Sequence, residues 1–127
     1  MIFLVMELLE GGSLRKYLIK ARESGKNIPP KICALIMKQI IEALLFVHKN
    51  HYMHRDLKPE NIMFSNNDDL TSLKMIDFGI GMKPTWNPDL GIKSHCGTLC
   101  YMSPEQLLNS VCTKVLFISF LICGHVE

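Results

Sequence analysis

Four polar residues near the middle of the sequence are of types that could carry out chemistry together. Asp56, Lys58 and Asn61 lie in one short segment, and Asp77 follows an apolar segment and precedes a Phe-Gly pair. A carboxylate and a side-chain amide are hard oxygen ligands, which suit Mg²⁺ held together with a phosphate. A second carboxylate could accept a proton, and a lysine could neutralise phosphate charge. The four residues therefore suggest magnesium-dependent phosphate chemistry.

A predicted β-hairpin would bring two of these residues together. Ile62–Phe64 and Leu73–Ile76 have the composition of short strands, and the residues after Phe64 form a polar turn. If the two strands pair, the start of the first lies beside the end of the second. Asn61 and Asp77 would then lie at the same edge of the hairpin.

Each of these residues, taken alone, also has a plain structural explanation. Asp-x-Gly is common in turns, a His-Arg-Asp triplet could form a surface salt bridge, and polar residues in loops are usually just solvated. Their joint occurrence in a fixed order and spacing makes chance a poor account.

Two helices and a strand are predicted before this segment. Residues 2–6 form a short apolar run that predicts a buried strand. Ser13 is a candidate N-cap for a helix that stops near Gly25, and Pro29-Pro30 open a stronger helix that ends near Lys49-Asn50. The stronger helix carries one apolar stripe, formed by Ile32, Ile36, Ile40, Ala43, Leu44 and Val47. Further apolar residues, Leu35, Ile41 and Leu45, predict that it is buried on more than one side.

The later half of the chain has weaker patterns. Tyr52-Met53 is predicted to be a strand stub, and Phe78–Pro104 a long loop of the kind that is usually functional. Glu105–Leu108 predicts the start of a helix after a proline.

Composition favours one intracellular globular domain. The chain has 127 residues, of which 48% are hydrophobic and 20% are charged, and its formal net charge of +2 is too small to indicate nucleic-acid binding. Five cysteines without a Cys-x-x-Cys pair favour reduced thiols and a cytoplasmic location, with the nucleus not excluded. The N-terminus does not resemble a signal peptide, and the longest apolar run, Val115–Cys123, is too short to span a bilayer. We therefore expect no membrane partner.

The segments around the four polar residues resemble the eukaryotic serine/threonine protein kinase family. His54–Asn61 reads HRDLKPEN, which matches the catalytic loop of kinases, and Asp77-Phe78-Gly79 matches their metal-binding motif. Ser103-Pro104-Glu105 resembles the Ala-Pro-Glu motif, and Gly97–Met102 resembles the substrate-facing loop before it. Met6–Leu14 resembles the hinge and the start of the next helix.

The resemblance implies an α+β fold, mainly α: a partial kinase C-lobe with a hinge strand and short β-hairpins. It covers residues 1–114 as a partial kinase domain, and residues 115–127 form a divergent apolar tail. The implied activity is transfer of the ATP γ-phosphate to serine or threonine of a protein substrate, with ATP and Mg²⁺ as cofactors.

The resemblance also implies roles for the residues of the catalytic centre. Asp56 would accept or orient the proton of the substrate hydroxyl, and Lys58 would contact the transferred phosphoryl group. Asn61 and Asp77 would hold Mg²⁺. Lys58 and Thr98 favour serine/threonine over tyrosine specificity.

Further roles follow for residues around this centre. The backbones of Glu7 and Leu9 would bind adenine, with Met6 as gatekeeper and Met63 as part of the floor of the site. Glu60 would face the substrate beside Thr98. Many kinases that prefer arginine upstream of the acceptor carry a glutamate directly after the Gly-Gly pair. This chain has Ser13 there. Glu60 alone is therefore weak support for a basic substrate.

A regulatory role is implied for two more residues. Arg55 would pair with a phosphate on Ser94, and this pair would order the segment before Gly97. The competing interpretation is that Arg55 makes only a local salt bridge.

The sequence departs from the family pattern at both ends. It contains no Gly-rich phosphate loop, no Val-Ala-Ile-Lys lysine and no helix-C glutamate, and after Thr113-Lys114 the expected Ser-Asp-x-Trp-Ser-x-Gly is replaced by an apolar run. A truncated gene model would explain both departures. We expect the chain alone to be inactive, because the groups that clamp the phosphates belong to the missing N-lobe of the complete parent domain. We also expect it to be marginally stable, because surfaces that would face that lobe are exposed. The alternative is a non-catalytic, pseudokinase-like binding or regulatory module.

Overall fold

A computed structural model describes residues 1, 3–67, 69–83, 92–93, 96–102, 107–108 and 111–112. The chain divides into two compact units: the first comprises Met1–Ile40 and Pro59–Ile76, and the second comprises Ile41–Lys58 and the described part of Asp77–Glu127. In chain order the elements are α1 (Leu14–Glu23), α2 (Pro30–Lys49), the 3₁₀ turn η1 (Pro59–Asn61), β1 (Ile62–Phe64), β2 (Leu73–Met75), β3 (Ile92–Lys93), the 3₁₀ turn η2 (Leu99–Tyr101) and β4 (Val111–Cys112).

Helix α1 begins and ends where its capping residues predict. The Ser13 side chain accepts a hydrogen bond from the Lys16 amide at 3.3 Å, which satisfies one donor of the first turn. At the other end Gly25 adopts a φ of 65°, and its amide donates to the Arg22 carbonyl at 3.0 Å. The next amide, of Lys26, donates to the Ala21 carbonyl at 3.2 Å. This pair of bonds is a Schellman cap, which glycine permits because a Cβ disfavours positive φ.

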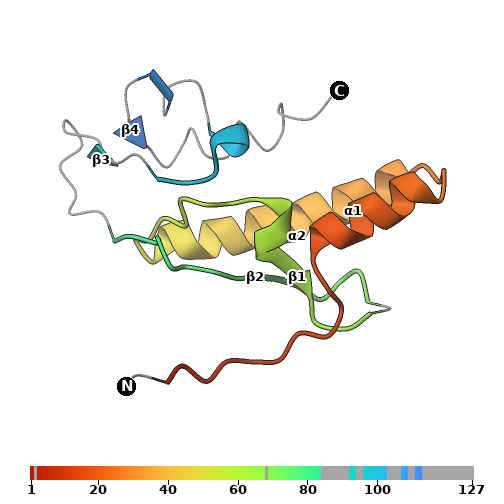
Figure 1. Cartoon of the computed structure of the whole chain (residues 1–127), viewed down its shortest axis with the longest axis horizontal. Coiled ribbons are helices and arrows are strands. Elements are labelled where there is room, and N and C mark those ends of the chain that lie inside the picture. The colour runs from red at the N-terminus through yellow and green to blue at the C-terminus, as the bar shows by residue number, and fades with distance from the viewer. Residues whose placement is uncertain are drawn as a thin grey trace. The chain divides into compact units, whose positions relative to one another are not determined.

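The predicted hairpin is confirmed. β1 and β2 pair antiparallel with Ile62 opposite Met75 and Phe64 opposite Leu73. α1 lies beside β1, as Figure 1 shows, and the Tyr17 and Phe64 rings meet edge to face with their centroids 5.7 Å apart. The buried apolar side chains of the first unit are Leu14, Ile36, Ile40, Ile62 and Phe64. Burial of Ile62 and Phe64 fixes the register of β1, because a slip by one residue would turn these side chains outward.

Asp69 organises the turn of this hairpin. Its carboxylate accepts hydrogen bonds from the Thr71 amide at 2.8 Å and the Thr71 hydroxyl at 2.5 Å. The Thr71 hydroxyl and amide hold the pKa of Asp69 below its usual value, because they bond the charged form. A carboxyl group whose pKa is lower in the folded chain than in the unfolded chain stabilises the fold when the pH lies above the unfolded-state pKa. This stability is lost as the pH falls through the folded-state pKa.

Gln39 joins α2 to the hairpin within the first unit. Its amide nitrogen donates to the Leu70 carbonyl at 2.8 Å and to the Leu35 carbonyl at 3.2 Å. Its amide oxygen accepts from the Leu73 amide at 3.2 Å. One side chain thus satisfies backbone groups at the start of β2 and in the turn before it, where the described residues form no further strand.

We expect Gln39→Leu to lower the free energy of unfolding by about 1–3 kcal/mol, because the partly buried Leu73 amide and Leu70 carbonyl lose their partner. Urea unfolding followed by circular dichroism measures the change. Gln39→Glu is the matched control: it keeps the acceptor for Leu73, loses the donor to Leu70, and should lose only part of the stability. An unfolding curve of Gln39→Leu that overlays that of the wild type would contradict this role.

The second unit has its own small core. Leu44 and Val47 of α2 are buried, as are Met53 and Leu57 and the imidazole of His54. Met53 and Met82 form an isolated antiparallel bridge, with N–O distances of 2.8 and 3.0 Å, so the predicted strand stub is realised at Met53. β3 and β4 pair antiparallel, with Ile92 opposite Cys112.

Of two predictions about apolar segments, one is wrong and the other is confirmed in part. The predicted hinge strand does not form at the described residues Phe3–Met6, and these side chains are largely exposed, Val5 to 95%. A strand needs a neighbouring strand for its backbone hydrogen bonds. In this part of the chain, backbone hydrogen bonds to other described residues begin only at Glu10 and Gly11, whose amides donate to the carbonyls of Ser65 and Phe64. The stronger helix is confirmed as α2; on its second side Leu35 and Ile41 are half-buried, whereas Leu45 is 46% exposed.

Several predictions fall on residues outside the described ones. These are Ser94, the Ser103-Pro104-Glu105 motif and the tail 115–127. Of the predicted helix after Pro104, only Leu107 and Leu108 are described, and both are helical. Among the described helices, none combines the length and the apolar character that a membrane crossing requires.

Candidate active site

The loop before Asp56 is anchored to the segment after β2, within the second unit. The buried His54 ring packs against the Phe78 ring with centroids 4.6 Å apart, and its Nδ1 accepts from the Asp56 amide at 3.3 Å. The Arg55 Nε donates to the Ile80 carbonyl at 2.6 Å. Arg55 adopts a φ of 68°, an uncommon conformation for a residue with a Cβ. These contacts hold the backbone on both sides of the Asp56 carboxylate.

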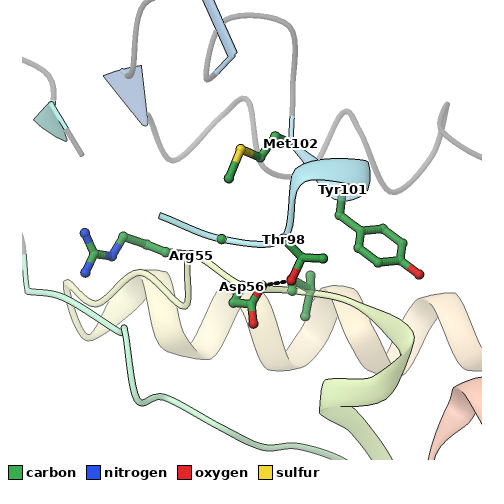
Figure 2. Close-up of a pocket in the computed structure, with 7 residues that line it drawn as sticks. Arg55, Asp56, Thr98, Tyr101 and Met102 are labelled. Carbon is green, nitrogen blue, oxygen red and sulfur yellow. Dashed lines mark hydrogen bonds between the residues drawn. The ribbon is translucent and has the colours of Figure 1, made fainter. Parts of the chain in front are cut away.

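Asp56, Lys58 and Thr98 form a closed triangle of hydrogen bonds, of which Figure 2 draws the one between Asp56 and Thr98. The Lys58 ammonium donates to Asp56 Oδ2 at 2.7 Å and to the Thr98 hydroxyl at 2.8 Å. The Thr98 hydroxyl donates in turn to Asp56 Oδ1 at 2.7 Å. The side chains of Asp56 and Lys58 are 14% and 20% exposed, so the pair is shielded from most solvent screening yet reachable from outside. Both carboxylate oxygens are therefore oriented before any substrate arrives.

Thr98 reaches Asp56 because the backbone beside it passes very close to the backbone of Arg55. Gly97 has a φ of 113°, and a Cβ there would lie 2.8 Å from the Arg55 carbonyl oxygen. Thr98 stands at the N-cap position of η2, but its hydroxyl bonds Asp56 instead of capping the turn. Only glycine allows both this conformation and this approach.

A small recess adjoins the triangle. Its volume of about 10 Å³ is near the room that one water molecule needs. Figure 2 shows Asp56 and Thr98 facing each other, with the Arg55 guanidinium directed away from them. The recess is lined by Arg55, Asp56, Leu57, Gly97, Thr98, Tyr101 and Met102.

The two residues expected to hold a metal lie at the ends of the hairpin. Asn61 is buried, 5% exposed, and its backbone carbonyl accepts a hydrogen bond from the Ile76 amide at 2.9 Å. Asp77 follows Ile76 directly and is exposed. Its backbone has a φ of 62°, and its Oδ1 accepts a hydrogen bond from the Gly79 amide at 3.2 Å. An amide and a carboxylate are both side-chain types that suit Mg²⁺ as oxygen ligands. Within the described residues no group of three or more His, Cys, Asp or Glu could hold a metal ion.

The residues expected around adenine belong to the first unit. Met6 is 75% exposed, Leu9 and Met63 are partly buried, and the Glu7 carboxylate lies 3.5 Å from the Lys74 ammonium. The Glu10 and Gly11 amides attach the end of this segment to β1 and the residue after it.

Glu60, expected to face the substrate, forms an ion pair with Arg15 of α1. Sequence reasoning missed this pair. It also missed the two hydrogen bonds of the Thr98 hydroxyl, which accepts from Lys58 and donates to Asp56. The partners are separated by 45 residues for Arg15 and Glu60, and by 42 for Asp56 and Thr98. No local spacing in the sequence signals contacts over such separations.

Comparisons with known proteins agree with these features. Residues 1–116 match a family model described as protein kinase domain. The chain is similar to the serine/threonine-protein kinase cds1 of Schizosaccharomyces pombe, with 39% identity over 106 residues, 84% of this chain and 21% of that protein. It is also similar to calcium-dependent protein kinase 8 of Arabidopsis thaliana, with 34% identity over 97% of this chain and 23% of that protein. The SNF-related serine/threonine-protein kinase of Rattus norvegicus is 33% identical over 98% of this chain and 17% of that protein. The chain thus spans roughly a fifth of the length of these curated relatives.

Proposed function

This chain belongs to the protein kinase family, and we propose that within a complete kinase domain it transfers the γ-phosphoryl group of ATP to serine or threonine of a protein substrate. The observation that carries the proposal is the triangle of Asp56, Lys58 and Thr98. A carboxylate with both oxygens oriented and only partly exposed is suited to accept a proton from a substrate hydroxyl.

The residues of the triangle divide the work of phosphoryl transfer. The substrate oxygen attacks the γ-phosphorus, its proton passes to Asp56, and the bond to the leaving diphosphate breaks. Lys58 neutralises negative charge on the transferred group, and Thr98 keeps the carboxylate and the ammonium in one geometry. Asn61 and Asp77 would hold Mg²⁺, which offsets phosphate charge when it is bound. In this family most of the rate enhancement comes from such positioning and electrostatics.

Serine/threonine specificity is part of the proposal. Lys58 and Thr98 support it, because the family members that phosphorylate tyrosine usually differ at both positions. The relatives named above as serine/threonine-protein kinases support it as well. For adenine, we propose that the backbones of Glu7 and Leu9 supply the hydrogen bonds, with Met6 and Met63 flanking the ring.

Regulation through Arg55 and Ser94 also stays a proposal. The Arg55 Nε bonds the Ile80 carbonyl, and its guanidinium is directed away from Asp56. A phosphate on Ser94 would offer this guanidinium charge-assisted hydrogen bonds. Activity of the complete domain after phosphatase treatment, compared with Ser94→Ala, tests the idea; an unchanged wild-type rate would exclude it.

The proposed function is tested with the chain alone and with residues 1–114 joined to the N-terminal lobe and to the remaining C-lobe of a related kinase. We expect the 127 residues alone to transfer almost no phosphate, since they contain no Gly-rich loop and no strand lysine to hold ATP. The joined protein should phosphorylate a serine/threonine peptide library from radiolabelled ATP. Asp56→Ala in the joined protein is the control for contaminating kinases. A folded joined protein with no transfer above this control would refute the proposal and favour a non-catalytic binding module.

A further inference from the structure

The positive charge of the chain is concentrated on α1 and the turn that ends it. Residues 14–26 contain five basic residues and one acidic residue, a local net charge of +4, whereas the whole chain carries only +2. The remaining residues together are therefore net negative. One of the five basic residues, Arg15, is paired with Glu60. The other four are exposed and form what we call the cationic face: Lys16, Lys20, Arg22 and Lys26.

The charges of the cationic face are not neutralised within the part of the chain that the structure describes. No carboxylate among the described residues forms an ion pair with any of these four side chains. Burial of a cation without a counter-charge costs free energy, so this face would also lie at the surface of a complete kinase domain. It is therefore open to a partner that brings negative charge.

Two aliphatic side chains lie among these cations. Leu18 is 39% exposed and Ile19 is 42% exposed. Residues three or four positions apart are neighbours on a helix surface, so Leu18 lies beside Arg22 and Ile19 beside Lys16. The exposed side of α1 thus combines positive charge with a small apolar contact area.

This combination distinguishes between the classes of anionic partner. A membrane-surface helix inserts its apolar side into lipid, but the apolar side of α1 is already packed, with Leu14 buried and the Tyr17 ring against Phe64. Single-stranded nucleic acid is bound by stacking on exposed aromatic side chains, and Tyr17 is the single aromatic residue of α1. An acidic protein segment with aliphatic side chains matches both the charge and the apolar contact area.

We propose that the cationic face of α1 is a docking site for an acidic, aliphatic segment of a partner protein. The carboxylates of the segment pair with the four cations, and its aliphatic side chains pack on Leu18 and Ile19. Lys16 and Arg22 are separated by about 9 Å along the helix axis, which an extended segment of about three residues covers. A short segment is therefore sufficient. None of these residues takes part in the proposed phosphoryl transfer.

The test measures binding of labelled peptides to the chain, without ATP, by fluorescence anisotropy. The probe peptide combines glutamates with leucines; one comparison peptide has glutamine for every glutamate, and the other has alanine for every leucine. At about 50 mM salt we expect the probe to bind about tenfold more tightly than the glutamine peptide and about threefold more tightly than the alanine peptide. At about 0.5 M salt the first ratio should fall to about twofold, because salt screens exposed charges.

Two double variants separate a docking site from a general effect of charge. Lys16→Gln/Lys20→Gln should lower the affinity for the probe about three- to tenfold. Lys49→Gln/Lys83→Gln is the matched control: it removes two exposed cations of the second unit, lowers the net charge equally, and should change the affinity by less than about twofold. Circular dichroism of each variant confirms that the helices are retained. The same ratios are expected in the joined protein, where a complete domain surrounds α1.

Three results would overturn the proposal. The first is equal binding of the probe and the glutamine peptide, and the second is an equal loss of affinity in the two double variants. The third is binding of phosphatidylserine vesicles, abolished by Lys16→Gln/Lys20→Gln, by a chain that does not bind the probe; this result would assign the face to a membrane. Asp56→Asn should leave the affinity for the probe unchanged, so that failure of the docking site and failure of the proposed phosphoryl transfer are distinguished.

Discussion

Replacement of Asp56 by asparagine in the joined kinase domain is expected to lower the rate of phosphoryl transfer by about 10²–10⁴-fold. Asparagine has nearly the same shape, but its amide cannot take up the proton of the substrate hydroxyl. It also offers one oxygen where the aspartate accepts two bonds, from Lys58 to Oδ2 and from Thr98 to Oδ1. The loss should fall mainly on kcat, because the proton acceptor acts in the transition state and not in binding of ATP.

Two variants of Thr98 serve as controls for this result. Thr98→Val removes the hydroxyl and should lower kcat by about tenfold, because Asp56 and Lys58 lose the group that bridges them. Thr98→Ser keeps the hydroxyl and should retain most of the activity. Initial rates at saturating ATP, with the KM for ATP measured in parallel, decide the matter. If Asp56→Asn kept a rate within threefold of the wild type, Asp56 would not be the proton acceptor.

Gly97→Ala is expected to produce the second large effect, a loss of about 2–5 kcal/mol in local stability together with a fall in activity. The added Cβ would lie 2.8 Å from the Arg55 carbonyl oxygen, and the φ of 113° is unfavourable for any residue with a Cβ. The backbone must therefore move away from the catalytic loop. That movement withdraws Thr98 from Asp56 and opens the triangle.

Gly25→Ala is the matched control, because Gly25 also has a positive φ, 65°, but a Cβ there would meet nothing within 4 Å. It should cost about 1–2 kcal/mol from the backbone conformation alone and leave kcat unchanged. Urea unfolding and initial rates for the two variants separate steric approach from conformational strain. Equal costs for the two substitutions, with full activity in both, would show that the approach of Gly97 to Arg55 does not position Thr98.

Much of the local structure could be predicted because its causes lie within a few residues. The Ser13 cap and the Gly25 stop bound α1. The buried side of α2 is formed by residues three or four positions apart: Ile36, Ile40, Leu44 and Val47. The β1–β2 hairpin followed from two short apolar runs separated by a polar turn. In each case the hydrogen bonds or the buried stripe connect residues close in sequence, so the pattern is visible there.

The predicted hinge strand failed for the opposite reason. The run around Val5 has the composition of a strand, but composition does not supply a neighbouring strand to bond. Backbone pairing with β1 and the residue after it begins only at Glu10 and Gly11. Whether an apolar run forms a strand is decided by the availability of an edge, which is a property of the packed chain.

The sequence by itself determined the family and the candidate site: the HRDLKPEN segment and Asp77-Phe78-Gly79 supply the proposed proton acceptor and the proposed metal ligands by type and order. Only the tertiary structure decided that Thr98 closes a triangle with Asp56 and Lys58, and that Arg15 occupies Glu60. These partners come from segments 40 or more residues apart. Their meeting depends on how helices, turns and the close approach of Gly97 pack together, and side-chain charge and geometry act only after that packing has formed.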